Sequence, residues 1–214
     1  MEVLITEDCQ YGRLTIFSSE NKVQIYNDDF DIIIPADEKI EVNSVSGTTV
    51  ITLENGKTFK TKRALNFYSK GNYLTVSPIK KGHTSAPKYR GVITVIPNGS
   101  HLRVINTLDI EKYLLQVVPS EMPRSFGVEA LKVQAVAART YAVSDILKGK
   151  YIKDGFHIKD TVESQVYNNQ VENEDATRAI EETEGKIMTY DNMPIDAKYF
   201  STSAGFTSHA SNVW

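Results

Sequence analysis

A change of pattern at Asp109 limits what this chain of 214 residues can fold into. Before Asp109, short β-branched or alternating runs recur, which is typical of strands. After it, three segments have the spacing and the terminal signals of helices, and strand-like runs return only near the end. This order of strands, helices and strands predicts an α+β fold with a β-rich N-terminal part.

Two Asn-Gly pairs mark the expected hairpins of the β-rich part. Asn55-Gly56 and Asn98-Gly99 each lie between strand-like runs, and such pairs favour tight two-residue turns. Between these hairpins, Ser77 to Lys88 contains two prolines and a glycine and reads as a linker or long loop. We therefore place a first, β-rich part at residues 1–88 and a second part at residues 89–214. The strand-like runs are Val3 to Thr6, Leu14 to Phe17, Val23 to Tyr26, Ile32 to Ile34, Ile40 to Val45, Thr49 to Leu53, Thr58 to Thr61, Val92 to Ile96 and Leu102 to Ile105.

The second part contains the helix signals. Asp109 has the side chain of an N-cap, Pro119 is expected to stop the first helix, and Gly149 follows the second as a C-terminal signal. A third helix is expected to end near Gly185. The expected elements are helices over Ile110 to Val118, Val128 to Leu147 and Glu174 to Thr183, and strands over Lys186 to Tyr190 and Ile195 to Ser203.

The longest predicted helix is apolar on nearly all sides, which is typical of a buried helix. Lys132 and Arg139 are seven residues apart on it and therefore share one face. A buried cation needs a partner, because unpaired burial is costly. Either both side chains extend to a solvated stripe, or they point toward Glu121 or a polar ligand.

Composition and charge exclude several classes of protein. The net charge is −3 and the isoelectric point is about 5.8, whereas nucleic-acid binders are usually basic. No apolar run reaches the length of a membrane span, and none has the pattern of a signal peptide. The single cysteine, Cys9, excludes an internal disulfide and a cysteine-based zinc site.

Glu121 is the candidate catalytic acid. In the stretch VVPSEMPR it lies between Pro119 and Pro123, which restrict the backbone, and Val118 and Met122 are apolar neighbours. Burial among such residues would raise the pKa of the Glu121 carboxyl above its ordinary value of about 4.3. The alternative is a glutamate at a helix end that is fully exposed to solvent.

The stretch NTLDIEKYLLQVVPSEMPRSFGVEALKVQAVAARTYAVS resembles the signature of the stage II sporulation protein D family, which also contains the amidase enhancers. Three later stretches, DTVESQVYNN, ATRAIEETEGKIMTY and PIDAKYFSTSAGFTSHASNVW, are similar to the family as well. The resemblance covers about residues 106–214, in four blocks in the expected order. Residues 1–105 resemble only loosely the β-rich N-terminal part of the family.

The resemblance implies an extracytoplasmic peptidoglycan enzyme that acts during spore engulfment, in the space between the mother-cell and forespore membranes. The implied activity is that of a lytic transglycosylase, which cleaves the MurNAc–GlcNAc β-1,4 bond of glycan strands stripped of peptides. The implied partners are these glycan strands, a cell-wall amidase and a membrane-bound engulfment protein. Family members usually have an N-terminal membrane helix and continue past the NVW motif, so we expect an anchor and a C-terminal extension that this sequence lacks.

The resemblance also assigns site residues. It implies Glu121 as the acid of the PSEM motif and assigns the substrate-binding role to Lys132, Arg139, Gln165, Tyr167, Tyr199, Ser201 and Ser203. Many relatives have cysteine and histidine near the SQVY motif, and some bind zinc there. This chain has Asp160, Glu163 and Ser164 instead, with His157 upstream, which is a poor set of zinc ligands. We therefore predict no structural zinc and no other cofactor.

The chemistry of a lytic transglycosylase requires only one carboxyl group. The acid gives its proton to the leaving oxygen and then takes one from the 6-hydroxyl of the sugar, which closes a 1,6-anhydro ring. The predicted strand places Tyr199, Ser201 and Ser203 on one face, where their hydroxyls suit a sugar. Gln165 can both donate and accept hydrogen bonds, whereas Tyr167 is alternatively a core residue. The competing function is a non-enzymatic module that binds the cell wall and stimulates an N-acetylmuramoyl-L-alanine amidase.

Overall fold

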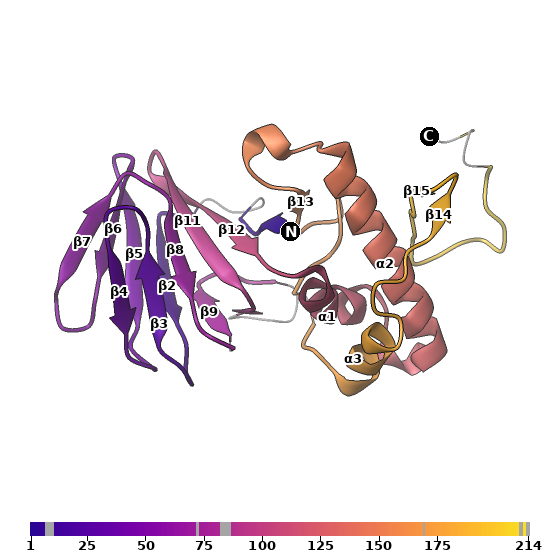
Figure 1. Cartoon of the computed structure of the whole chain (residues 1–214), viewed down its shortest axis with the longest axis horizontal. Helices are drawn as coiled ribbons and strands as arrows, with labels where there is room; N and C mark the ends of the chain where they lie inside the picture. The colour runs from indigo at the N-terminus through magenta and orange to yellow at the C-terminus, as the bar shows by residue number, and fades with distance from the viewer. Residues whose placement is uncertain (7–10, 72, 82–86, 169, 210–211, 213–214) are drawn as a thin grey trace.

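The computed structural model describes residues 1–6, 11–71, 73–81, 87–168, 170–209 and 212. Within them most strands gather at one end of the molecule, and the three α-helices lie at the other end together with a short two-stranded hairpin (Figure 1). The predicted α+β class and the β-rich N-terminal part are therefore confirmed. No helix in the described residues has both the length and the apolar character needed to cross a membrane.

Two sheets, antiparallel except for one parallel pair of strands, make up most of the β-rich part. In the described residues the larger sheet has the strand order β13-β1-β12-β11-β8-β3-β4, and the other has the order β10-β9-β2-β5-β6-β7. The strands of the larger sheet are β1 (Glu2–Leu4), β3 (Val23–Tyr26), β4 (Asp31–Ile34), β8 (Leu65–Tyr68), β11 (Val92–Asn98), β12 (His101–Thr107) and β13 (Ile158–Lys159). Those of the other sheet are β2 (Arg13–Phe17), β5 (Ile40–Val45), β6 (Thr48–Thr52), β7 (Thr58–Thr61), β9 (Leu74–Ser77) and β10 (Lys88–Tyr89).

The two sheets bury their inner faces in one core. Buried and half-buried residues alternate along β3 and β5, as expected where one face of each strand is covered. Ile25 and Phe67 from the larger sheet belong to the same buried cluster as Ile16 and Val42 from the other. The alternation of residue types along these strands in the sequence therefore corresponds to alternating burial of their side chains.

Both predicted hairpins are confirmed. Strands β6 and β7 are antiparallel and flank Asn55-Gly56. Strands β11 and β12 are antiparallel and are joined by Gly99-Ser100, with Asn98 as the last residue of β11. Gly56 and Gly99 have φ angles of 82° and 62°, in the left-handed region that glycine adopts without strain. Within these two sheets, β8, β9, β10 and β13 have no counterpart among the predicted runs.

The division between residues 88 and 89 stays a prediction. Strands β11 and β12, on its C-terminal side, belong to the same sheet as β8 on its N-terminal side. Strand β1 at the start of the chain pairs in parallel with β13, far along the sequence. Of the predicted linker, residues 82–86 lie outside the described residues.

The three predicted helices are confirmed, with changed ends. They are α1 (Ile110–Glu121), α2 (Val128–Lys148) and α3 (Glu174–Glu181). Asp109 caps α1, since its side chain accepts from the N–H of Glu111 at 2.8 Å, and Gly149 ends α2 in the left-handed conformation. Along α2, Leu131 and Ala138 are buried against the other helices, whereas Val133 is 70% exposed.

The prediction that Pro119 stops the first helix is wrong. Pro119 lies within the last turn of α1, which continues to Glu121. The proline removes only its own N–H, and the N–H of Met122 still donates to the carbonyl of Val118 at 3.0 Å. The hydroxyl of Ser120 also donates to the carbonyl of Gln116 at 2.6 Å. Glu121 is therefore held in helical geometry.

The predicted strand from Ile195 to Ser203 is also wrong. A two-stranded sheet ends earlier, with β14 (Thr189–Tyr190) and β15 (Met193–Pro194), and residues 195–208 form no strand. Alternation alone does not make a strand, because the backbone groups also need a neighbouring strand to bond. Part of the pattern survives, since Ala197 is buried and Tyr199 half-buried between exposed neighbours.

Candidate active site

Glu121 ends α1 and turns its carboxyl group inward. The backbone N–H of Val166 donates to Oε1 of Glu121 at 2.6 Å. Burial raises the pKa of the Glu121 carboxyl above its ordinary value, and the hydrogen bonds from Val166 and the Tyr199 hydroxyl oppose that rise without cancelling it. The carboxyl group is therefore protonated to a higher pH than an exposed glutamate.

Gln165 connects Glu121 to the interior through Tyr199. The side-chain amide of Gln165 donates to the Tyr199 hydroxyl oxygen at 3.0 Å and to the carbonyl of Ala138 at 3.2 Å. Its carbonyl oxygen accepts from the hydroxyl of Tyr113 at 3.2 Å. Because the Tyr199 oxygen accepts from Gln165, its own hydrogen is available to the Glu121 carboxylate. Burial, and next the charge of Glu121, raise the pKa of Tyr199, so its phenol remains a donor.

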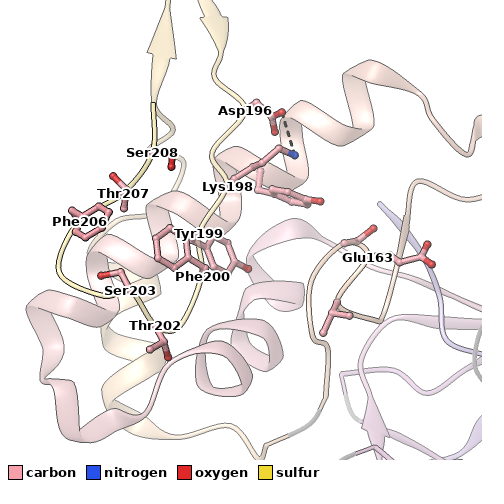
Figure 2. Close-up of a pocket in the computed structure, with 13 residues that line it drawn as sticks. Glu163, Asp196, Lys198, Tyr199, Phe200, Thr202, Ser203, Phe206, Thr207 and Ser208 are labelled. Atoms are coloured by element: carbon pink, nitrogen blue, oxygen red, sulfur yellow. Dashed lines mark ion pairs between the residues drawn. The ribbon is translucent and has the colours of Figure 1, made fainter. Parts of the chain in front are cut away.

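A pocket of about 1000 Å³ opens beside Tyr199. Its aromatic side chains are Tyr141 from α2 and Tyr199, Phe200 and Phe206 from the segment after β15. Figure 2 shows that segment passing Asp196 and Tyr199, turning near Thr202 and returning past Phe206, while Glu163 projects from a separate loop. Glu121 itself does not line the pocket, so Tyr199 is the residue that the pocket and the acid share.

Arg139 is held by an acid other than Glu121. Its guanidinium group donates from Nε and Nη2 to the two carboxylate oxygens of Glu111, both at 2.7 Å, and from Nη1 to the carbonyl of Lys186 at 3.0 Å. Only 1% of Arg139 is exposed. This ion pair joins α2 to α1 and to the chain after α3, and it leaves the pKa of Glu121 without a neighbouring cation to lower it.

Lys132 lies in a similar arrangement nearer the surface. Its ammonium group is 2.7 Å from Glu129 and 2.5 Å from Glu182, and these two carboxylates raise its pKa. The structure thus pairs each of the two cations with acids of this chain. Neither lines the pocket.

The other residues predicted to bind substrate are distributed between the core and the pocket. Tyr167 is buried, donates to Oδ1 of Asn106 at 2.7 Å and stacks on Tyr113 with ring centroids 5.0 Å apart. Ser203 lines the pocket, whereas Ser201 is exposed outside it. Their roles stay predictions.

Sequence reasoning missed several residues that the structure brings to this place. Val166 donates to Glu121 through its backbone N–H, and a pattern of side chains does not indicate which backbone groups reach the site. Tyr141 lies on the predicted long helix, but its ring gave no signal among so many apolar residues. Phe200 lies in the segment that was expected to be a strand, and Phe206 lies just beyond it, where the sequence showed no signal.

The loop between β13 and Gln165 is anchored by ion pairs. The carboxylate of Asp160 is buried and lies 2.5 Å from the ammonium group of Lys81. Lys159 and Glu163 form a second, more exposed pair at 2.8 Å. Among the described residues, no three side chains of histidine, cysteine, aspartate or glutamate lie close enough together to hold a metal ion.

Comparison with known proteins finds similarity to one family. Residues 98–190 match the family described as Stage II sporulation protein. The chain is 35% identical over 150 residues to Stage II sporulation protein D of Bacillus subtilis, covering 64% of this chain and 41% of that protein. It is 40% identical over 98 residues to Amidase enhancer of the same organism, covering 46% of this chain and 13% of the relative.

A third relative is less informative. An uncharacterized protein of Brachyspira hyodysenteriae is 33% identical over 175 residues, covering 81% of this chain and 46% of that protein. The chain thus spans less than half the length of these curated relatives. No solved structure matches the chain.

Proposed function

We propose that this chain is a peptidoglycan lytic transglycosylase, because residues 98–190 match the family described as Stage II sporulation protein and the chain is 35% identical to Stage II sporulation protein D of Bacillus subtilis. Its substrate is the glycan strand stripped of peptides, and it cleaves the MurNAc–GlcNAc β-1,4 bond during spore engulfment. The place of action is extracytoplasmic, at the cell wall between the mother-cell and forespore membranes.

Glu121 acts first as an acid in this mechanism. Its protonated carboxyl group gives a proton to the oxygen that links the two sugars, and the bond from that oxygen to the anomeric carbon breaks. The raised pKa of Glu121 supports this step, because it keeps the carboxyl group protonated at higher pH.

The ionised Glu121 then acts as a base. It removes the proton of the 6-hydroxyl, whose oxygen bonds to the anomeric carbon and forms the 1,6-anhydro ring. The proton returns to Glu121, and no water is consumed. The N–H of Val166 and the hydroxyl of Tyr199 are placed to stabilise the carboxylate that exists between the two steps.

We assign different tasks to the residues inherited from the family motif. Tyr199 and Ser203 line the pocket and are proposed to contact the glycan, while Gln165 orients the Tyr199 hydroxyl. Arg139 and Tyr167 are buried and support the site through α1 and the core. Lys132 and Ser201, which lie outside the pocket, would reach only a longer glycan.

The observation that carries the proposal is the half-buried, hydrogen-bonded Glu121 beside a pocket that contains Tyr199.

The test is mass spectrometry of products from peptide-free glycan strands, with the parent chain and with Glu121→Gln. Anhydro-muramyl ends from the parent alone are expected. Glu181→Gln, at an exposed position on α3, is the matched control and should cleave like the parent. Reducing ends would show hydrolysis and contradict the intramolecular mechanism.

The similarity to Amidase enhancer favours a second candidate function. In it, the chain binds glycan and stimulates a cell-wall amidase, in company with a membrane-bound engulfment protein, without cleaving anything itself. Stimulation of a purified amidase by the parent and equally by Glu121→Gln, with no anhydro product from either, would establish this function and reject the first.

A further inference from the structure

Phe200 and Phe206 expose large apolar rings in the wall of a pocket. Phe200 is 66% exposed and Phe206 is 81% exposed, and both line the 1000 Å³ space beside Tyr199. A single exposed apolar residue is ordinary, whereas a group of them around a pocket marks a binding surface. The segment turns between them, so that Tyr199 lies before the turn and Phe206 lies after it (Figure 2).

We propose that Phe200, Phe206 and Tyr141 form an aromatic subsite for one sugar ring of the glycan, next to the bond that Glu121 cleaves. This proposal rests on the proposed function for the identity of the ligand. It adds three residues that bind the sugar through their rings and that were not among the expected substrate-binding residues.

The remaining wall of the pocket has the chemistry that a sugar requires. Hydroxyl groups come from Ser164, Thr202, Ser203, Thr207 and Ser208. A pyranose has apolar C–H faces and a rim of hydroxyls, so it uses both the rings and these polar groups. A lipid chain would leave the hydroxyls of the wall without partners.

The charges of the wall distinguish a glycan from a nucleic acid. Glu163 and Asp196 contribute two carboxylates, and Lys198 contributes one ammonium group, which is 3.3 Å from Asp196. A phosphate backbone needs a surplus of cations, which this set does not provide. The N-acetylglucosamine ring of the glycan is uncharged and meets no such repulsion.

The position of the subsite follows from Tyr199. Its hydroxyl contacts Glu121, and its ring packs edge-on against Tyr141 with centroids 6.4 Å apart. A sugar stacked on Phe206 therefore lies beside the acid rather than over it. The subsite thus binds a sugar on one side of the cleaved bond and fixes how far the strand enters the site.

The test measures binding separately from cleavage. In chains that all carry Glu121→Gln, titration calorimetry with a β-1,4-linked tetramer of N-acetylglucosamine gives the dissociation constant. Phe206→Ala and Phe200→Ala should each raise it about two- to tenfold, the value of one aromatic contact, and Phe206→Trp should restore it. Phe126→Ala removes a ring that is 65% exposed outside the pocket and should leave binding unchanged.

Each result bears on one of the two proposals. Equal affinity in the parent and Phe206→Ala, an equal loss in Phe126→Ala, or no binding of the tetramer by the parent would overturn the subsite. Ring-dependent binding without any anhydro product would support the subsite and reject the transglycosylase. Anhydro product with ring-independent binding would do the reverse.

Discussion

The backbone N–H of Val166 lies 2.6 Å from Oε1 of Glu121, and the two residues are 45 positions apart in sequence. This bond favours the ionised carboxylate, whereas burial favours the neutral acid and has the larger effect on the pKa. A carboxyl group that must first release and then regain a proton benefits from both the hydrogen bond and burial. Neither its protonated nor its ionised form is then so stable that the proton transfer is blocked.

Tyr199→Phe should shift the pH dependence of glycan cleavage upward. Under the proposed function, activity requires protonated Glu121 and therefore declines as pH rises through the pKa of that carboxyl group. The Tyr199 hydroxyl lowers this pKa, so its removal should move the basic limb of the rate profile to higher pH. Initial rates of anhydro-product formation across pH measure the shift. Tyr190→Phe, on the exposed β14–β15 hairpin, should leave the profile in place, and an unmoved limb in Tyr199→Phe would contradict the contact.

Glu121→Gln should gain stability relative to the parent as pH rises. The pKa of Glu121 is raised in the folded state, so its favourable contribution is present below the unfolded pKa of about 4.5 and is lost through the folded pKa. The neutral amide has no such loss. Melting temperatures of the two chains, measured from acid to neutral pH, should therefore diverge in favour of the variant.

The same comparison has an internal reference. The other carboxyl groups are present in both chains, so the difference reports on the Glu121 carboxyl. Glu181→Gln, at an exposed position on α3, is the matched control for the change from carboxyl to amide. A flat or falling difference for Glu121→Gln would mean that its pKa is not raised.

Arg139→Met should unfold the helical part readily. The substitution leaves Glu111 without its bidentate partner in a largely buried place, which costs about 3–5 kcal/mol. The double variant Arg139→Met, Glu111→Leu should recover most of that loss, because both charges are removed. Urea unfolding monitored by circular dichroism gives the free energies. Arg178→Met, at an exposed ion pair, should cost no more than about 1 kcal/mol.

Gln165→Leu should slow cleavage with little effect on substrate affinity. It removes the donor that orients the Tyr199 hydroxyl, and it leaves the buried hydroxyl of Tyr113 without its acceptor. We expect kcat to fall about tenfold at nearly constant KM, and stability to fall by about 1–3 kcal/mol. Gln24→Leu, at a half-buried site on β3, is the matched control for losing a glutamine. A change confined to KM would place Gln165 in substrate binding instead.

Local signals in the sequence were enough for most of the architecture. Period-two runs and the two Asn-Gly turns fixed the hairpins, since turn geometry depends on adjacent residues. Asp109 and Gly149 marked helix ends for the same reason. The first helix was predicted too short because the rule for Pro119 ignores how little a single missing N–H costs in a last turn.

The contacts of the site required long-range information. The partners of Lys132 and Arg139 lie up to 50 residues away, and charge alone could not choose between Glu121 and Glu111. The strand expected after Ile195 depended on a neighbour that the pattern cannot supply. Burial of Glu121 was anticipated from Val118 and Met122. Its hydrogen-bond donors, Val166 and Tyr199, lie in two loops far along the chain, and no local pattern relates them to Glu121.

The place of Glu121 in α1 has an electrostatic consequence of its own. The aligned peptide dipoles of a helix leave a partial negative charge at its carboxyl end, where they disfavour a carboxylate by about 0.3–1 kcal/mol. Glu121 is the last residue of α1, and the final turn contains no basic side chain to offset this field. The helix dipole of α1 therefore acts in the same sense as burial, and both favour the protonated form of the Glu121 carboxyl group. An acid at the opposite end of the same helix would experience the reverse.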